Sequence, residues 1–153
     1  MLNVGERAPE FTLPDQDGRD VSLTSLLNRG PLILYFYPAD FTPGCTRQAC
    51  LVRSLHDEIR KVGLRVAGIS PQNPESHQRF REHHALPFTL LADPGKAVIR
   101  MYGVDGPLGL GVRRASFLID PGRIVRDRVL ADFRIGTHEA FIRKLLILHE
   151  ALH

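Results

Sequence analysis

The sequence predicts a single α/β domain over residues 1–153, with a mixed β-sheet and α-helices on its faces. Three short apolar segments, at residues 32–37, 64–69 and 88–91, are rich in branched and aromatic residues, as buried parallel strands are. The stretches between them are longer, more polar and spaced like helices. The length of 153 residues suits one domain, and the sequence shows no internal repeat or linker.

The segment between the first two strands is expected to form a long helix over residues 43–61. Four apolar residues recur there at steps of three and four, which places them on one face of a helix: Val52, Leu55, Ile59 and Val62. Strand, helix and strand make a βαβ unit. Further helices are expected over residues 74–84, where Pro74 follows Asn73, and over residues 96–102.

The C-terminal part is expected to add an antiparallel strand pair and a last helix. Residues 114–119 and 124–130 flank the turn sequence Asp120-Pro-Gly-Arg123, as the strands of a hairpin would. The final segment carries a stripe at steps of four, three and four, which predicts an amphipathic helix that packs on the sheet: Phe141, Leu145, Leu148 and Leu152.

Composition and charge argue against several classes of function. The 20 basic residues are interleaved with 17 acidic ones, so a nucleic-acid partner gains little support. No apolar run approaches the roughly 20 residues of a membrane span, and the first residues do not look like an export signal. We therefore expect a cytoplasmic protein without a membrane partner. Two cysteines in a reducing compartment are not expected to form a permanent disulfide, so their chemistry becomes the question.

The position of Cys45 predicts a reactive thiolate. Thr42 is a good N-cap and Pro43 a good first helical residue, which puts Cys45 in the first turn of the long helix. A helix N-terminus stabilises anions, so a substantial thiolate fraction is expected at neutral pH. Thr42 is expected both to cap the helix and to hydrogen-bond the sulfur or an oxygen of a bound substrate. Pro38 has no N–H group and is expected to shield the site.

The spacing of Cys45 and Cys50 has a geometric consequence. On an intact helix, residues five apart are separated by about 7.5 Å of rise, which puts their Cα atoms roughly 8–9 Å apart. A disulfide needs a Cα separation of about 4.4–6.8 Å. A bond between these cysteines therefore requires the first turns of the helix to unwind, and we predict a redox-dependent helix.

A cation beside the sulfur is expected from a neighbouring strand. Gln48 shares the helix face of Cys45, whereas Arg47 points away around the helix. Arg114, which opens the strand at residues 114–119, is the best candidate for the cation. Strand alternation would turn Arg113 the other way.

These residues carry a family resemblance. The pattern Pro38-x-x-x-Thr42-x-x-Cys45 matches the active-site signature of peroxiredoxins, and Cys50 five residues downstream resembles the peroxiredoxin Q, or bacterioferritin comigratory protein, subgroup. The resemblance implies a thioredoxin-like fold. It also implies a peroxidase that reduces hydrogen peroxide and organic hydroperoxides without metal, haem or flavin, with electrons from thioredoxin or a similar dithiol protein. Within the subgroup a monomer is favoured.

The same resemblance implies the role of each site residue. Cys45 would be the peroxidatic cysteine and Cys50 the resolving one; Thr42 and Arg114 would polarise the peroxide, Pro38 would shield the site, and Gln48 would support the arginine. The expected chemistry is a sulfenic acid on Cys45 that condenses with Cys50 to a disulfide, which an external dithiol reopens.

Three departures from the family pattern are mild. Ala39 stands where lysine is frequent, Gln48 where glutamate is frequent, and Gln72 where an acidic residue is common. Of these three, only Gln48 is expected to touch the site.

Other functions fit the sequence less well. His77, His83 and His84 lie near one another, but His83 and His84 point apart on a helix and no zinc-like spacing accompanies them. The glycine run at residues 106–111 precedes a strand rather than a helix, which favours a flexible loop over a phosphate site. A disulfide oxidoreductase would favour Cys-x-x-Cys. A redox-sensing or chaperone-like module on the same fold would lack peroxide turnover, which separates it from a peroxidase.

Overall fold

A computed structural model gives the fold of residues 1–150, and its centre is a five-stranded mixed sheet. The strands lie in the order β5 (Thr89–Ala92), β4 (Arg65–Ser70), β3 (Leu32–Phe36), β6 (Ala115–Ile119) and β7 (Val125–Leu130). β3 runs parallel to β4, and β4 runs parallel to β5, while β6 is antiparallel to both β3 and β7. The predicted α/β class and the antiparallel hairpin are confirmed.

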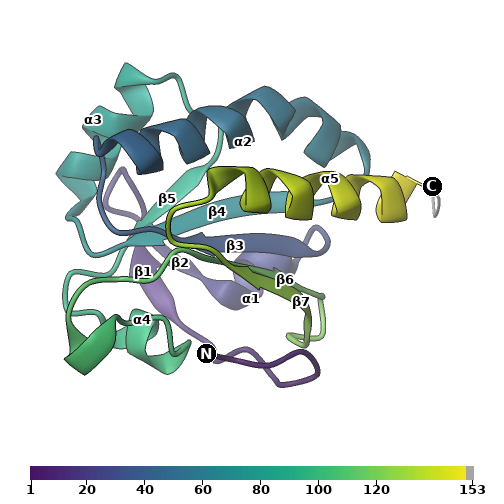
Figure 1. Cartoon of the computed structure of the whole chain (residues 1–153), viewed down its shortest axis with the longest axis horizontal. Helices are drawn as coiled ribbons and strands as arrows, with labels where there is room; N and C mark the ends of the chain where they lie inside the picture. Colours follow the sequence, from purple (N-terminus) through teal and green to yellow (C-terminus); the bar gives the residue numbers. More distant parts are fainter. Residues whose placement is uncertain (151–153) are drawn as a thin grey trace.

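Helices cover one face of the sheet, as Figure 1 shows. The long helix α2 (Pro43–Lys61) lies beside α5 (Ile135–Glu150), and α3 (Pro74–His83) packs next to β5. The opposite face carries a small hairpin of β1 (Thr12–Pro14) and β2 (Asp20–Ser22), with α1 (Leu23–Leu27) and α4 (Ala97–Met101). The sheet is therefore buried on both sides.

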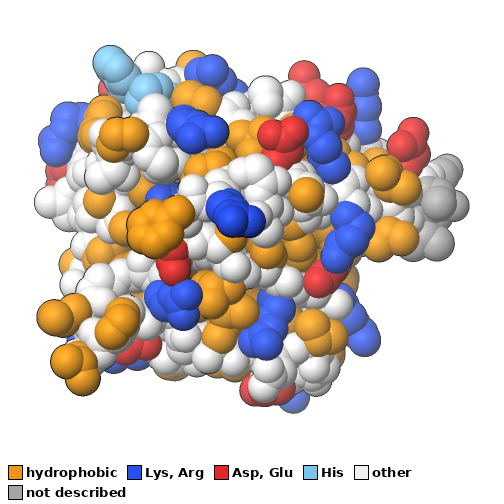
Figure 2. Space-filling view, in the orientation of Figure 1, with side chains coloured by type: hydrophobic (Ala, Val, Ile, Leu, Met, Phe, Trp, Pro, Cys, Tyr) orange, Lys and Arg blue, Asp and Glu red, His pale blue; other side chains and the backbone are white. Residues whose placement is uncertain are grey.

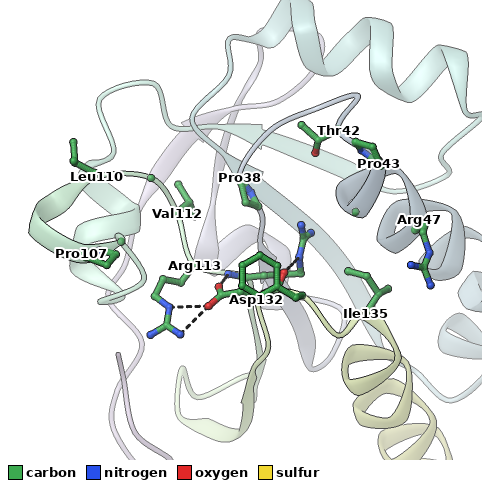
Figure 3. Close-up of a pocket in the computed structure, with 15 residues that line it drawn as sticks. Pro38, Thr42, Pro43, Arg47, Pro107, Leu110, Val112, Arg113, Asp132 and Ile135 are labelled. Atoms are coloured by element: carbon green, nitrogen blue, oxygen red, sulfur yellow. Dashed lines mark hydrogen bonds and ion pairs between the residues drawn. The ribbon is translucent and has the colours of Figure 1, made fainter.

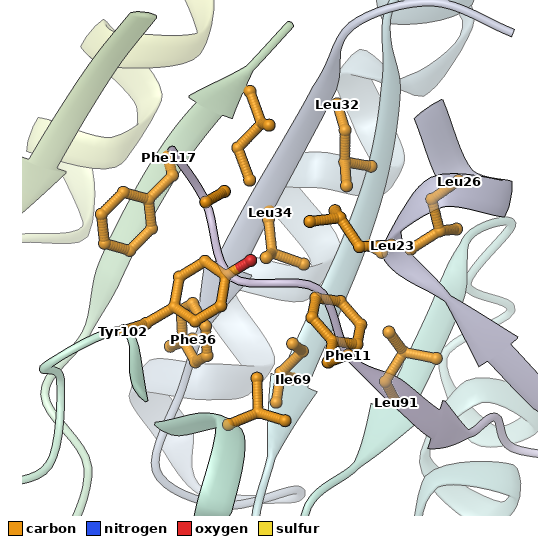
Figure 4. Packing of buried hydrophobic residues seen from close by; sticks show 14 of the residues in the cluster. Phe11, Leu23, Leu26, Leu32, Leu34, Phe36, Ile69, Leu91, Tyr102 and Phe117 are labelled. Atoms are coloured by element: carbon orange, nitrogen blue, oxygen red, sulfur yellow. The ribbon is translucent and has the colours of Figure 1, made fainter. Parts of the chain in front are cut away.

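The core beneath the N-terminal hairpin is held by aromatic rings. Phe36, Tyr102 and Phe117 contact one another with ring centroids 5.2–5.9 Å apart (Figure 4). The Tyr102 hydroxyl donates a hydrogen bond to the carbonyl of Pro9, which ties the N-terminal segment to this core.

The second core lies between the sheet and helices α2 and α5, and it contains the candidate nucleophile Cys45. Ile33 and Tyr35 of β3 face it, and the ring of Tyr37, just after the strand, lies tilted against that of Tyr35 at a centroid distance of 5.4 Å. Gly68 of β4 leaves room for the Tyr35 ring, because a Cβ atom there would lie 2.9 Å from Cζ of Tyr35. The side chain of Cys45 is therefore part of a packed core.

The predicted and observed elements differ at the N-terminus. The predicted bounds of α2 match the observed ones, and the other predicted ranges differ from the observed ones by at most one residue at either end. β1, β2 and α1 escape prediction because three to five residues are too short to show a period. The Ser22 hydroxyl that accepts a hydrogen bond from the Ser25 backbone N–H is the local signal for α1.

The predicted stripe on α5 is wrong at Leu148. This side chain is 54% exposed, whereas the buried face of the helix is formed by Ile135, His138, Phe141, Ile142, Leu145 and Leu146. The helix carries apolar residues on more than one face, and its packing against α2 determines which face is buried. Leu152, the last residue of the predicted stripe, lies outside the described residues, as does the end of the predicted domain at residue 153.

Across residues 1–150, no helix is both long enough and apolar enough to cross a membrane.

The predicted loop at residues 106–111 contains a short 3₁₀ turn, Pro107–Gly109, and its base is closed by a bridge between Asp105 and Val112.

Candidate active site

The loop between β3 and α2 carries the predicted signature residues. Phe41, just before the helix, has φ of 64°, in the left-handed region. α2 then begins at Pro43, which makes Cys45 its third residue, with free backbone N–H groups of the first turn around it. The thiol is buried, at 2% exposure, and lies against the sheet.

The expected capping role of Thr42 needs a correction. Thr42 occupies the N-cap position, and its carbonyl accepts a hydrogen bond from the Thr46 backbone N–H at 2.8 Å. Its hydroxyl makes no cap bond, because it donates instead to the carbonyl of Ala39, at 2.9 Å. The side chain therefore closes the loop on itself.

Arg114 reaches the sulfur of Cys45 from the strand side. Its Nη2 atom lies 3.3 Å from Sγ, and the guanidinium is buried. Gly44 makes this approach possible, because a Cβ atom there would lie 3.1 Å from Nη2. A fixed positive charge next to a buried sulfur stabilises the thiolate form over the neutral thiol.

The guanidinium of Arg114 is fixed from two further directions. Its Nη1 atom donates to Oε1 of Gln48 at 2.7 Å, and its Nε atom donates to the carbonyl of Asp132 at 3.3 Å. The Asp132 carboxylate also accepts the backbone N–H of Arg114, and it pairs with Arg113 at 2.8 Å. Burial would raise the pKa of Asp132, but the hydrogen bonds and charges of Arg113 and Arg114 lower it overall, so it stays ionised.

A buried polar cluster anchors the other side of the loop. Asp40 accepts hydrogen bonds from the hydroxyls of Tyr37 and Ser76, at 2.7 and 2.8 Å, and contacts Nδ1 of His77 at 2.7 Å. The Nε2 atom of His77 faces the carbonyl of Leu91 at 3.0 Å, so each ring nitrogen lies within hydrogen-bond distance of an oxygen acceptor. Burial alone would raise the pKa of Asp40, but the bonds and charge of His77 lower it overall.

Gln72 also contacts the loop between β3 and α2, which corrects the expectation that only Gln48 among the departures touches the site. Its Oε1 atom accepts the backbone N–H of Asp40 at 3.1 Å, and its Nε2 atom donates to the carbonyl of Pro38 at 3.4 Å. An amide can make both contacts because it carries a donor and an acceptor, whereas a carboxylate has acceptors only.

An open cavity of about 820 Å³ leads to this site (Figure 3). Pro38, Thr42 and Arg114 line one part of it, and the turn from Gly106 to Val112 lines another. Three apolar side chains in and beside its lining are exposed: Leu108 at 99%, Leu110 at 73% and Phe133 at 95%. In Figure 2, hydrophobic side chains (orange) gather at the lower left of the visible face, near α4.

Cys50 has different surroundings from Cys45. It lies on the same unbroken helix, it is half-buried, and both thiols are free. Nδ1 of His84 lies 4.0 Å from its sulfur. In the described residues, no group of three or more His, Cys, Asp or Glu side chains is placed to hold a metal ion.

Sequence reasoning missed several residues of the site. Asp132 and His84 come from distant segments without any local motif, so only the folded chain brings them to the cysteines. Asp40 has a weak local signal, since it is a titratable residue close to the apolar stretch at residues 32–37, whereas His77 lies in a polar segment and has none.

Comparison with known proteins identifies the family. Residues 4–128 match the model of the AhpC/TSA family. A rice protein (Oryza sativa subsp. indica) named putative peroxiredoxin Q, chloroplastic, is 46% identical over 146 residues, which cover 95% of this chain and 67% of that protein. Peroxiredoxin Bcp of Escherichia coli K12 is 43% identical over 155 residues, which cover 97% of each chain.

Solved structures agree with these relatives. Peroxidoxin BcpB of Mycobacterium tuberculosis superposes with a TM-score of 0.90 at 35% identity, covering 100% of this chain and 99% of that one. A peroxiredoxin Q of Xanthomonas campestris gives 0.82 at 28% identity, covering 91% and 90%. The fold is therefore thioredoxin-like, and the chain belongs to the AhpC/TSA family, within the peroxiredoxin Q and Bcp group of thiol peroxidases.

Proposed function

We propose that Cys45 is the peroxidatic cysteine of a peroxidase that reduces hydrogen peroxide and organic hydroperoxides. The observation that carries this proposal is the 3.3 Å contact between Nη2 of Arg114 and Sγ of Cys45, at the start of a long helix. The helix N-terminus and the guanidinium both favour the anion, and the thiolate is the nucleophile.

In the first step, the Cys45 thiolate attacks the outer oxygen of the hydroperoxide. The S–O bond forms as the O–O bond breaks, and the leaving oxygen takes a proton and departs as water or an alcohol. Arg114 and Thr42 are proposed to polarise the peroxide in the cavity that they both line, with Pro38 shielding the sulfur from bulk water. Arg114 would donate to the peroxide, and Thr42 would accept its O–H, because the Thr42 hydroxyl gives its own proton to Ala39. The product is a sulfenic acid on Cys45.

In the second step, Cys50 is proposed to resolve the sulfenic acid as an intramolecular disulfide with release of water. Both cysteines lie on the unbroken helix α2, where residues five apart have Cα atoms roughly 8–9 Å apart. The first turn must therefore open before the sulfurs can bond. Thioredoxin or a similar dithiol protein is proposed to reduce the disulfide by exchange.

The rest of the proposal follows the sequence expectations. The chemistry assigned to the two thiols requires no metal, haem or flavin cofactor, and no nucleic-acid or membrane partner. A cytoplasmic location and a monomeric state complete it.

Hydroperoxide consumption coupled to a thioredoxin system tests the function. The wild-type protein should turn over, Cys45→Ser should not, and Cys50→Ser should react once and recycle poorly. If the wild-type protein shows no turnover, the redox-sensing or chaperone-like alternative replaces the peroxidase. Normal thioredoxin-dependent cycling of Cys50→Ser would remove Cys50 from the mechanism.

Opening of the helix is tested by hydrogen exchange. The amides of the first two turns of α2 should exchange faster in the disulfide form than in the reduced form, whereas those near Ile59 should not change. Equal helix content and equal protection in both forms would contradict the proposed opening.

A further inference from the structure

His84 lies directly beside the proposed resolving thiol. It follows the last residue of α3, and its Nδ1 atom is 4.0 Å from Sγ of Cys50, within the range of a hydrogen bond to sulfur. Figure 2 shows histidine side chains, in pale blue, at the surface over the region of α3. A neutral imidazole nitrogen can accept a proton from a thiol.

The ring of His84 is held in this place by both helices. Phe80 packs against it edge-on at a centroid distance of 5.2 Å, and Phe41 of the loop between β3 and α2 lies 6.2 Å away. On the α2 side, Arg53 donates a hydrogen bond to the His84 carbonyl. The contact with Cys50 is therefore built into the packing of α2 against α3.

The surroundings of His84 favour its neutral form. Burial lowers the pKa of His84, and the positive charges of His83 and Arg53 lower it further. The charged and titratable groups that face the ring are Cys50 and Arg53 from α2 and His83 from α3, and its remaining ring contacts, Phe41 and Phe80, are apolar. At neutral pH the ring is a proton acceptor.

We propose that His84 is the general base of the resolving step, an inference that rests on the proposed function of the two cysteines. Nδ1 takes the proton of the Cys50 thiol, and the resulting thiolate attacks the sulfur of the Cys45 sulfenic acid. The S–S bond forms as the S–O bond breaks. The leaving hydroxide takes the proton from His84 and departs as water, which returns the ring to its neutral form.

In this mechanism, Cys45 moves when the disulfide forms, whereas Cys50 stays in place. Cys50 lies in the eighth position of α2, beyond the first two turns, so it can keep its contact with His84 while the first turn opens. Cys45 then moves toward a thiol that is already activated.

Alkylation of Cys50 in a Cys45→Ser background tests the base without any peroxide chemistry. An ordinary thiol with a pKa of about 8.5 is about 3% thiolate at pH 7, so complete ionisation could raise its reactivity by at most about 30-fold. His84→Gln should slow alkylation by iodoacetamide roughly tenfold at pH 7. His56→Gln is the matched control and should leave the rate unchanged, because the His56 ring lies against Phe88, away from Cys50 and His84.

Stopped-flow oxidation of the complete protein tests the same base in the reaction. His84→Gln and His84→Asn should form the sulfenic acid at the wild-type rate and the disulfide more slowly. The rate of disulfide formation in both variants should rise with pH as an unassisted thiol ionises, whereas the wild-type rate should already level off near neutrality and fall as His84 is protonated. A purely structural role would change the rate without changing its pH profile.

The outcomes separate this inference from the proposed function. If alkylation of Cys50 and disulfide formation are the same with and without His84 from about pH 6 to pH 8, the inference is wrong. If Cys50 alkylation depends on His84 but the wild-type protein consumes no peroxide, the proposed function fails while the activation of the thiol by His84 stands.

Discussion

The two cysteines lie on one helix but in opposite chemical surroundings. Cys45 is buried in the first turn beside a permanent cation, Arg114, which is itself held by Gln48 and Asp132. Cys50 is half-buried and faces a titratable base, His84. A fixed charge suits the proposed peroxidatic sulfur, which would have to be an anion before the peroxide arrives. A proton acceptor suits the proposed resolving thiol, which would react only after the helix has opened.

The largest effect is expected on the anchor of the Cys45 loop. Asp40→Asn should lower the free energy of unfolding by about 3–5 kcal/mol, because it leaves His77 buried without its carboxylate. Chemical denaturation measures the change. Asp57→Asn, on the exposed side of α2, should stay within about 0.5 kcal/mol of the wild type and serves as the control.

The same variant predicts a pH dependence with a definite sign. The pKa of Asp40 is lowered from the ordinary value of 3.8, so its contribution to stability is complete above about pH 3.8 and is lost as the pH falls through the lower folded value. The stability difference between wild type and Asp40→Asn should therefore shrink on acidification below that point. A difference that is constant with pH would contradict the ion pair.

Arg114→Lys should slow the reaction of Cys45 with peroxide about 10²–10³-fold, the range found when one aligned donor is removed from an active site. Lysine keeps the charge but loses the planar fork that contacts Gln48 and Cys45 together. Stopped-flow rates of sulfenic acid formation measure the effect, and Cys50 alkylation should not change. Arg113→Lys should slow peroxide reaction far less, since Arg113 pairs with Asp132 instead. Equal losses in the two variants would remove the special role of Arg114.

Gln48→Leu should slow the same step about 10- to 100-fold, because a hydrogen bond to a charged group contributes about 1.5–3 kcal/mol. It removes the acceptor of Nη1 of Arg114 without touching Cys50. Gln48→Glu keeps an acceptor oxygen and should react close to the wild-type rate. If Gln48→Leu reacts as fast as the wild type, Asp132 alone suffices to hold the guanidinium.

Tyr35→Phe should give the smallest effect, a gain of about 1 kcal/mol in the free energy of unfolding. The Tyr35 hydroxyl is buried in the core around Cys45 and has no hydrogen-bond partner within residues 1–150, and an unsatisfied buried group is destabilising. Tyr37→Phe is the matched control. Its free energy of unfolding should fall by about 1 kcal/mol, because the Tyr37 hydroxyl donates a hydrogen bond to Asp40 at 2.7 Å. A destabilised Tyr35→Phe would show that the hydroxyl has a partner.

The sequence by itself determined the reactive end of α2. Thr42, Pro43 and Cys45 lie within four residues, so local rules of helix initiation place the thiol in the first turn, and the alternation of a strand selects Arg114 over Arg113. The βαβ unit and the hairpin follow from periodicities over many residues. These local patterns agree with the folded structure because they depend only on residues that are close in sequence.

The tertiary structure alone decided what surrounds each thiol. Asp132 reaches Arg114 across 18 residues of sequence, His84 reaches Cys50 across 34, and His77 reaches Asp40 across 37. Leu148 of α5 lies at the surface because the packing of α5 against α2 buries a different face of the helix. Such contacts have no signature in a linear pattern, since packing selects each partner from the whole chain.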